Sequence, residues 1–248
     1  MTPRNDAAVS VTLDLVDEFF GGVFDSLASW LPTLEQQLAP VIRTGGLTGA
    51  GLASLIEADA LAVIGDAWLP IYGAGFCATA EVIGSGNPLA WWQGPQRQPL
   101  LSAAIVGEQY AVDYRRLEWF RVPERTGRGH VAGPYVDYLC SNEITLTSSL
   151  PLFVDGAFVG VACADVLVSS LEATLLPAME RLENCATLVN AGGRVVVSSN
   201  PDYATGDPYR GVRPGDSLET LTEAVGERAG AVVLRSERFP LAVVVERP

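Results

Sequence analysis

The chain has 248 residues, of which 48% are hydrophobic and 18% are charged, and its formal net charge at pH 7 is −13. This apolar content suffices for a sizeable core and excludes an intrinsically disordered chain. The acidic balance argues against nucleic acid and against anionic membrane surfaces as partners, because both attract basic proteins.

The first twenty residues do not have the pattern of a secretory signal, which needs an unbroken apolar segment. Acidic residues interrupt the apolar positions at Asp6, Asp14, Asp17 and Glu18. No run of about 18 apolar residues occurs, so we expect no membrane-spanning helix. The cysteines form no C-x-x-C pair, which is typical of reduced thiols. They are Cys77, Cys140, Cys163 and Cys185. From the missing signal pattern and the reduced thiols, we expect the protein to be cytosolic.

Apolar residues recur in steps of three and four between residues 9 and 40, which predicts a long amphipathic helix. Gly21-Gly22 is expected to weaken its middle, and Pro32 to restart it. The apolar stripe is wide for a surface helix, so it must pack on the rest of the chain or on a second copy. We therefore expect a homodimer through residues 9–40. We also expect the chain to divide into a helical segment at 1–45 and one domain at 46–248.

The next part of the chain predicts one capped helix and several strands. Thr48 follows a glycine-rich hinge and is expected to cap a short helix. Strands are expected at 71–83, 89–93 and 100–106. Residues 108–133 are mixed in character and predict a long excursion, which in a compact domain is usually functional. Whether this excursion closes over a site as a lid stays open.

Two hairpins dominate the second half. Runs of β-branched and aromatic residues at 144–154 and 157–168 flank Asp155-Gly156, a strong hairpin signal. A helix at 169–183 is expected to follow, capped by Ser169 or Ser170 and kinked near Pro177. A second hairpin at 186–200, a helix at 215–230 and two strands complete the chain. Adjacent hairpins with covering helices predict an α+β fold built on one antiparallel sheet.

The chain offers few groups for catalysis or metal binding. His130 is its one histidine and is interpreted as a loop residue. A catalytic triad needs a base beside a nucleophile, and a zinc site needs three or four soft ligands. We therefore expect no catalytic residue, no metal site and no cofactor.

Aromatic and acidic residues gather in the apolar middle of the chain: Trp119, Phe120, Tyr135, Asp137 and Asp165. A buried carboxylate is unfavourable without a partner. Asp165, at the end of an apolar strand, either caps the next helix or meets a cation. Asp137 is either a turn residue or a residue that faces a ligand.

The same stretches resemble the Cache family of small-molecule sensors. The matching segments are EWF (118–120), GPYVDY (133–138), SLPLFVDGAFVGVACADVLVSSLE (149–172) and NAGGRVVVSSNPD (190–202). They cover roughly residues 115–202 by motif, and the order of elements is similar over the whole chain. The resemblance implies a long N-terminal helix packed on a PAS-like antiparallel sheet with flanking helices.

In Cache domains that bind amino acids or amines, an aromatic pair, a Tyr-x-Asp and a strand Asp surround the ligand. The resemblance assigns these roles to Trp119 and Phe120, to Tyr135 and Asp137, and to Asp165. Two carboxylates and aromatic faces suit an ammonium group, through charge-assisted hydrogen bonds and cation–π contacts.

The sequence departs from the amino-acid pattern at two positions. Leu117 stands where that pattern has an arginine for the ligand carboxylate, and Phe120 stands where it has a tyrosine. Arg115 and Arg116 are near but offset, and Arg116 lies about one helical turn before Trp119. An amine without a carboxylate, or an ω-amino acid, therefore fits at least as well as an α-amino acid.

Four further aromatic residues could line the pocket or pack in the core. Tyr110 and Tyr114 can supply hydroxyl groups, with ordinary packing as the alternative. Trp91 and Trp92 point to opposite faces of an expected strand, and core packing is the interpretation for each.

The sequence thus predicts a cytosolic, non-catalytic sensor domain for an amine or amino-acid-like ligand, acting through a signalling partner that it does not identify. One alternative is a protein-interaction or dimerisation module with a vestigial pocket. Another is an enzyme that uses Asp137 and Asp165 as acid and base.

Overall fold

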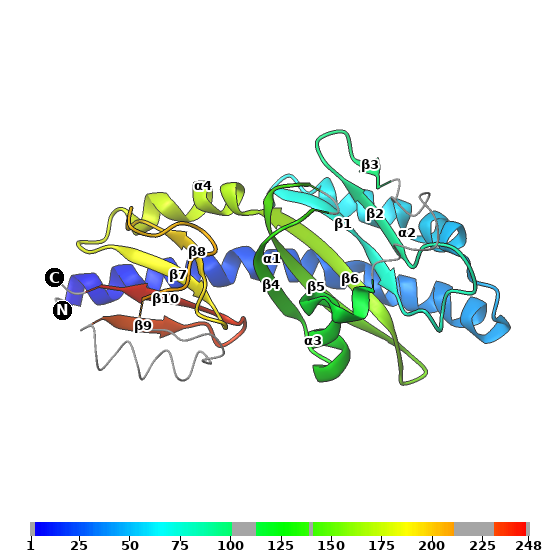
Figure 1. The fold of residues 1–248 in the computed structure, drawn as a ribbon. Helices are drawn as coiled ribbons and strands as arrows, with labels where there is room; N and C mark the ends of the chain where they lie inside the picture. Colours follow the sequence, from blue (N-terminus) through cyan, green and yellow to red (C-terminus); the bar gives the residue numbers. More distant parts are fainter. Residues whose placement is uncertain (1–2, 101–112, 139–140, 211–230, 247–248) are drawn as a thin grey trace.

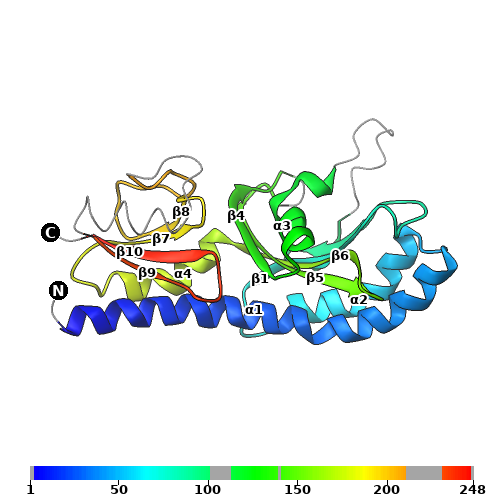
Figure 2. The ribbon, with the colours of Figure 1, turned by 90° about the horizontal axis from the view of Figure 1, so that it is seen from below.

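A long helix, α1 (Pro3–Thr44), runs along the molecule, and two antiparallel sheets lie side by side on it (Figure 1, Figure 2). The computed structural model describes residues 3–100, 113–138, 141–210 and 231–246. The α+β class and the long N-terminal helix are confirmed. The expected strand at 100–106, apart from Leu100, and the expected helix at 215–230 lie outside the described residues, as do Cys140 and Tyr110.

α1 continues through the positions where a weak point was predicted. Gly21 and Gly22 lie within the helix, and side chains from other parts of the chain pack against both of them. A Cβ at Gly21 would lie 2.8 Å from the Arg238 guanidinium, and one at Gly22 would lie 3.1 Å from Leu69. Pro32 also lies inside the helix, so the expected restart there is wrong.

The apolar stripe of α1 packs within the chain. Its buried members are Val16, Phe20, Val23, Leu27, Leu34 and Leu38, each fully covered. Both sheets and two other helices contact this face. The stripe therefore needs no second copy to cover it. The homodimer through residues 9–40 stays a prediction, but the width of the stripe no longer supports it.

The larger sheet has six strands in the order β3-β2-β1-β6-β5-β4. They are β1 (Ile71–Ala78), β2 (Leu89–Gln93), β3 (Gln98–Pro99), β4 (His130–Val136), β5 (Ile144–Val154) and β6 (Ala157–Leu167). α1 and α2 (Gly49–Ile64) cover one face. The short helices η3 (Tyr114–Arg116) and α3 (Glu118–Thr126) lie on the opposite face (Figure 2).

The smaller sheet has four strands in the order β8-β7-β10-β9. They are β7 (Ala186–Asn190), β8 (Val195–Ser198), β9 (Val232–Arg235) and β10 (Leu241–Val245). The sequence predicted one sheet. The strands form two because α4 (Val168–Met179) leads the chain away from β6 along α1 before β7 begins (Figure 1). α1 ends at Thr44, and the division into segments 1–45 and 46–248 stays a prediction.

The β5–β6 hairpin turns at Asp155 and Gly156, as predicted, and both residues have positive φ, 50° and 82°. The register then shifts between Leu152 and Phe153, so that Val159 is the extra residue of a β-bulge. Gly160, next to the bulge, has φ 153°, and a Cβ there would lie 2.3 Å from the Cys77 carbonyl oxygen.

Two local predictions about helix caps have opposite outcomes. Thr48 caps α2, since its hydroxyl accepts a hydrogen bond of 3.0 Å from the Gly51 N–H. The predicted cap at Ser169 or Ser170 is wrong: α4 begins at Val168, after Leu167, without a side-chain cap. His130 begins β4, so its interpretation as a loop residue is also wrong.

Cys77, Cys163 and Cys185 are free thiols. Burial raises the pKa of Cys77 and Cys163, which keeps both thiols protonated. Within the described part of the chain, no helix is long and apolar enough to span a membrane.

Replacing Gly160 with alanine tests the bulge. The new Cβ would clash with the β1 backbone, so we expect the free energy of unfolding to fall by about 2 kcal/mol or more. Gly156→Ala is the matched control, because its φ is positive but no atom lies within 4 Å of the added Cβ. It should lose only about 1 kcal/mol. Equal losses in urea denaturation would contradict the clash.

Candidate ligand-binding site

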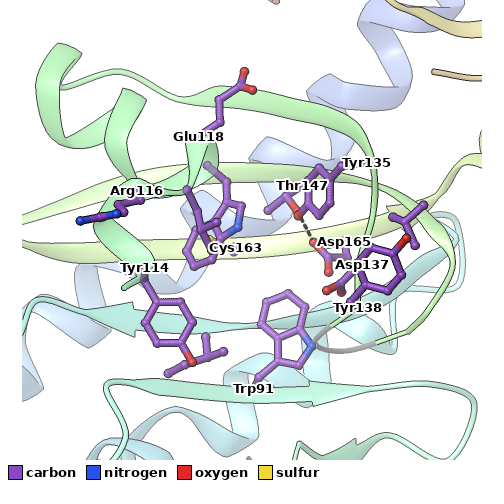
Figure 3. Close-up of a pocket in the computed structure, with 14 residues that line it drawn as sticks. Trp91, Tyr114, Arg116, Glu118, Tyr135, Asp137, Tyr138, Thr147, Cys163 and Asp165 are labelled. Carbon is purple, nitrogen blue, oxygen red and sulfur yellow. Dashed lines mark hydrogen bonds between the residues drawn. The ribbon is translucent and has the colours of Figure 1, made fainter. Parts of the chain in front are cut away.

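A cavity of about 430 Å³ lies between the six-stranded sheet and the η3–α3 segment (Figure 3). This volume is in the range of small-molecule sites. The residues that line it are Leu89, Trp91, Tyr114, Arg116, Leu117, Glu118, Trp119, Tyr135, Val136, Asp137, Tyr138, Thr147, Cys163 and Asp165. Six of the seven site residues predicted from the sequence are in this set.

The strands supply the inner wall through their two-residue alternation. On β6, Cys163 and Asp165 face the cavity, while Ala162 and Ala164 face the main core under the sheet. Thr147 on β5 is paired directly with Asp165, so the two side chains lie next to each other on the same face. A small strand-borne cluster of polar groups thus lies in a mostly apolar surface.

Trp91 lies across β1 because two glycines leave room for its indole. A Cβ at Gly73 would lie 2.8 Å from the Trp91 ring, and one at Gly75 would lie 2.9 Å from it. Gly73 is paired with Asp165 on the next strand, which places the indole near that carboxylate (Figure 3). Trp92 faces the core on the other side. The opposite-face prediction is confirmed, but Trp91 lines the cavity as well as packing in a core cluster.

Asp165 is a buried acid with a hydroxyl partner. The residue is 5% exposed, and the Thr147 hydroxyl donates to its Oδ1 at 2.6 Å. Burial raises the pKa of Asp165 to about 8, the Thr147 hydrogen bond opposes this rise, and the charge of Asp137 adds to it. The alternative that Asp165 caps the following helix is wrong, because that helix has no side-chain cap.

Tyr135 extends this chain of hydroxyl groups. Its hydroxyl is hydrogen-bonded to the Thr147 hydroxyl. Thr147 has a single proton, which it donates to Asp165, so it accepts from Tyr135. Burial, together with the charge of Asp165, raises the pKa of Tyr135 and keeps the phenol protonated. The order Tyr135 to Thr147 to Asp165 orients the carboxyl group toward the cavity.

Asp137 combines the two roles that the sequence left open. Its N–H donates to the Glu143 carbonyl at 3.0 Å, and its own carbonyl accepts from the Asn142 N–H at 2.7 Å. Its backbone therefore closes the turn after β4. Its side chain is buried and lies beside Asp165 at the cavity (Figure 3).

The two neighbouring arginines differ in position. Arg116 lines the cavity, but its side chain is 86% exposed and its Nε lies 3.0 Å from Asp113. Arg115 is paired with Glu81 at 2.8 Å and does not line the cavity. Of the two, Arg116 is therefore the arginine that a ligand in the cavity can reach.

The predicted aromatic pair is divided by the turn of α3. Trp119 faces the cavity and packs on Tyr114, with ring centroids 5.9 Å apart. Phe120 does not line the cavity, so its assignment to the ligand is wrong. It is 1% exposed and packs edge-on against Phe158, 5.5 Å away. Adjacent helical residues point about 100° apart, so one of the pair enters the core.

Several cavity residues were missed from the sequence, chiefly Thr147, Cys163, Glu118 and Tyr138. The position of Thr147 could have been inferred, because polar residues alternate with apolar ones at the start of β5 and so share one face of the strand. Glu118 is 2.8 Å from the His130 ring and 52% exposed. Among the described residues, no group of three or more His, Cys, Asp or Glu side chains can hold a metal ion.

The chain is similar to known proteins both in sequence, over part of its length, and in fold. Residues 89–173 match the family model for the first PDC sensor domain of methyl-accepting chemotaxis protein-like proteins. The matched segment contains every described residue that lines the cavity. Residues 89–173 are thus similar to a PDC sensor domain, and the chain as a whole has a Cache-like fold. The resemblance seen in the sequence is thereby confirmed.

Solved structures cover nearly the whole chain. The sensory domain of the Campylobacter jejuni chemoreceptor Tlp3 with isoleucine bound has a TM-score of 0.58 and 10% identity, covering 98% of this chain and 91% of that chain. Its L-valine complex has a TM-score of 0.59 and 11% identity, with coverage of 98% and 91%. The extracellular domain of mmHK1S-Z2, described as a histidine kinase, has a TM-score of 0.60 and 13% identity, with coverage of 97% and 95%. No curated protein sequence matches the chain.

Asp165 should make the stability of the protein depend on pH. Its pKa is near 8 when folded and about 3.9 when unfolded. The folded state therefore holds a proton that the unfolded state has lost between these values. The contribution of Asp165 to stability is complete below pH 4 and falls by up to about 1.4 kcal/mol per pH unit until pH 8.

Urea denaturation at pH 5, 6, 7 and 8 measures this slope. Asp165→Asn should remove it and should leave the variant more stable than the wild type at pH 8. Asp155→Asn, at an exposed hairpin acid, is the control and should keep the wild-type slope. A wild-type slope in Asp165→Asn would show that Asp165 is ionised throughout.

Proposed function

We propose that this chain is a sensor domain that binds a small amine or amino-acid-like molecule in the cavity beside α3 and does not transform it. The observation that carries the proposal is the acidic wall, which we define as Asp137 and Asp165. These two buried carboxyl groups lie together in a cavity whose other walls are largely aromatic and aliphatic.

An ammonium group suits this wall on physical grounds. A carboxylate removed from water is stabilised by a nearby cation and by hydrogen-bond donors. An ammonium group donates charge-assisted hydrogen bonds to both acids, and aromatic faces attract it further. Trp91 and Tyr135 supply such faces beside the acidic wall (Figure 3). Trp119 also lines the cavity.

The charges favour an amine whose carboxylate, if present, is distant. An α-carboxylate next to the ammonium group would lie close to two acidic side chains and be repelled. Arg116 is the basic residue among the described lining residues, and it lies at the exposed rim (Figure 3). It is suited to the carboxylate of an ω-amino acid after exchange with Asp113. Tlp3 complexes with isoleucine and valine support amino-acid-like ligands within this fold.

Signal output would require a signalling partner, which the sequence does not identify. The cytosolic location expected from the sequence stays a prediction, and two structural neighbours are named as extracellular domains. The interaction-module alternative predicts a chain that binds protein partners and no amine. The enzyme alternative predicts that a bound amine is consumed.

A thermal-shift screen of the whole chain against alkylamines, biogenic amines, polyamines, and α- and ω-amino acids tests the proposal. A ligand at 100 times its Kd should stabilise the fold by about 2.7 kcal/mol and raise Tm. Amines should give larger shifts than the matching α-amino acids. Asp137→Asn should weaken binding at least about tenfold, because it removes one charge from the wall.

Asp155→Asn is the control for the loss of one negative charge outside the cavity, and it should bind like the wild type. Mass spectrometry of the ligand after overnight incubation checks that it is unchanged. The absence of any shift by amines and amino acids would contradict the proposal and favour a protein-binding module. Loss of the ligand would favour the enzyme alternative.

A further inference from the structure

The charge of the acidic wall depends on which groups surround it. On the sheet, β6 contributes Asp165 and the Cys163 thiol, and β5 contributes the Thr147 hydroxyl. β4 and the turn after it contribute the Tyr135 hydroxyl, Asp137 and the Tyr138 hydroxyl. β2 contributes the Trp91 indole, and η3–α3 contribute the Tyr114 hydroxyl, Trp119, Arg116 and Glu118. Arg116 is largely exposed and lies 3.0 Å from Asp113. The charged group that acts on Asp165 is a second acid, Asp137.

Two ionised carboxylates in one poorly solvated wall repel each other, so the wall favours holding a proton when no ligand is present. The fold indicates which acid holds that proton, because Asp165 lies on β6 in the middle of the sheet, between β1 and β5, whereas Asp137 follows the edge strand β4. Thr147 donates to Oδ1 of Asp165, so a neutral Asp165 carries its proton on Oδ2. The raised pKa of Asp165 agrees with this assignment.

We propose that the ammonium group of the ligand enters the acidic wall in exchange for the proton on Asp165, so that binding at neutral pH releases one proton. This inference rests on the proposed recognition of an amine. The step is an exchange without covalent change: the ammonium group keeps its three protons, Asp165 loses one to the buffer, and a charge-assisted hydrogen bond replaces the O–H bond. The empty wall carries one negative charge, and the occupied wall carries two carboxylates around one cation.

The exchange specifies the ligand and the conditions that favour it. The head group must be a cation with N–H donors, because a neutral isostere cannot compensate a newly ionised Asp165. Affinity should rise by up to about tenfold per pH unit while Asp165 is protonated in the free protein. The increase should end near pH 8, and affinity should fall again where the amine itself loses its charge. A sensor built in this way responds to a given amine concentration more strongly at alkaline pH.

Isothermal titration calorimetry on the whole chain tests the exchange with n-butylamine, phenethylamine and putrescine as probes. Titrations at pH 6.5 and 8.5 are run in two buffers of different ionisation enthalpy at each pH. At pH 6.5 the two observed enthalpies should differ by about one buffer ionisation per bound amine, and at pH 8.5 the difference should shrink. Affinity should be at least about tenfold higher at pH 8.5.

Two variants assign the proton. Asp165→Asn keeps the shape of the side chain and should bind more weakly, with no dependence of enthalpy on the buffer. Thr147→Val removes the hydrogen bond that favours the ionised acid, so proton release should persist and the affinity increase should move to higher pH. 2-Phenylethanol is the neutral match of phenethylamine and should release no proton. Circular dichroism confirms that each variant is folded.

The outcomes separate this inference from the proposed function. Binding of an amine with the same enthalpy in both buffers and the same affinity at both pH values would overturn the exchange and leave amine recognition standing. Proton release that persists in Asp165→Asn would overturn the assignment to Asp165. Failure of every amine to bind at both pH values would overturn the proposed function and the exchange together.

Discussion

The pairing of β5 with β6 is the constraint on which the cavity depends. The turn at Asp155-Gly156 alone would align Thr147 with Ala164 and would place Asp165 opposite Leu146. The bulge at Val159 shifts the register by one residue, so that Thr147 pairs with Asp165. Because a one-residue shift reverses the face of every side chain relative to its partner strand, this bulge brings the hydroxyl and the carboxyl group together. Gly160 permits it, since the close β1 backbone leaves no room for a Cβ.

The site is built at the expense of local stability. An apolar residue in place of Asp165 would fill the buried face of β6 without desolvating an acid, and Gly73 and Gly75 give up side-chain packing so that Trp91 can lie across β1. Such features are difficult to explain by folding alone, because buried acids are unfavourable unless compensated. They are consistent with a wall prepared for a cation. The Tyr135–Thr147–Asp165 chain adds orientation, which reduces what the ligand must order when it binds.

The arrangement of the two sheets places this cavity within a larger frame. α1 packs on both, and Asn190 at the end of β7 donates a hydrogen bond of 2.6 Å to the Gly133 carbonyl on β4. A smaller cavity lies at this junction, and Tyr135 and Glu118 line it as well as the ligand cavity. On α1, Phe24 stacks on Phe239, which lies in the connection between β9 and β10, with ring centroids 5.3 Å apart. The wall of the proposed ligand site is therefore continuous with the contact between the sheets.

The sequence by itself determined most of the local elements: the α1 stripe, the Thr48 cap, the two hairpins, and a set of aromatic and acidic residues of which all but Phe120 line one cavity. These follow from periodicity, turn chemistry and the resemblance, all of which are expressed over short stretches of chain. Tertiary structure alone decided the division into two sheets, the continuity of α1 through Gly21-Gly22, the face of α3 that takes Phe120 into the core, and the register that joins Thr147 to Asp165. The reason is that each of these depends on atoms from distant segments, such as Arg238 against α1 or the β1 backbone against Gly160, which no local pattern contains.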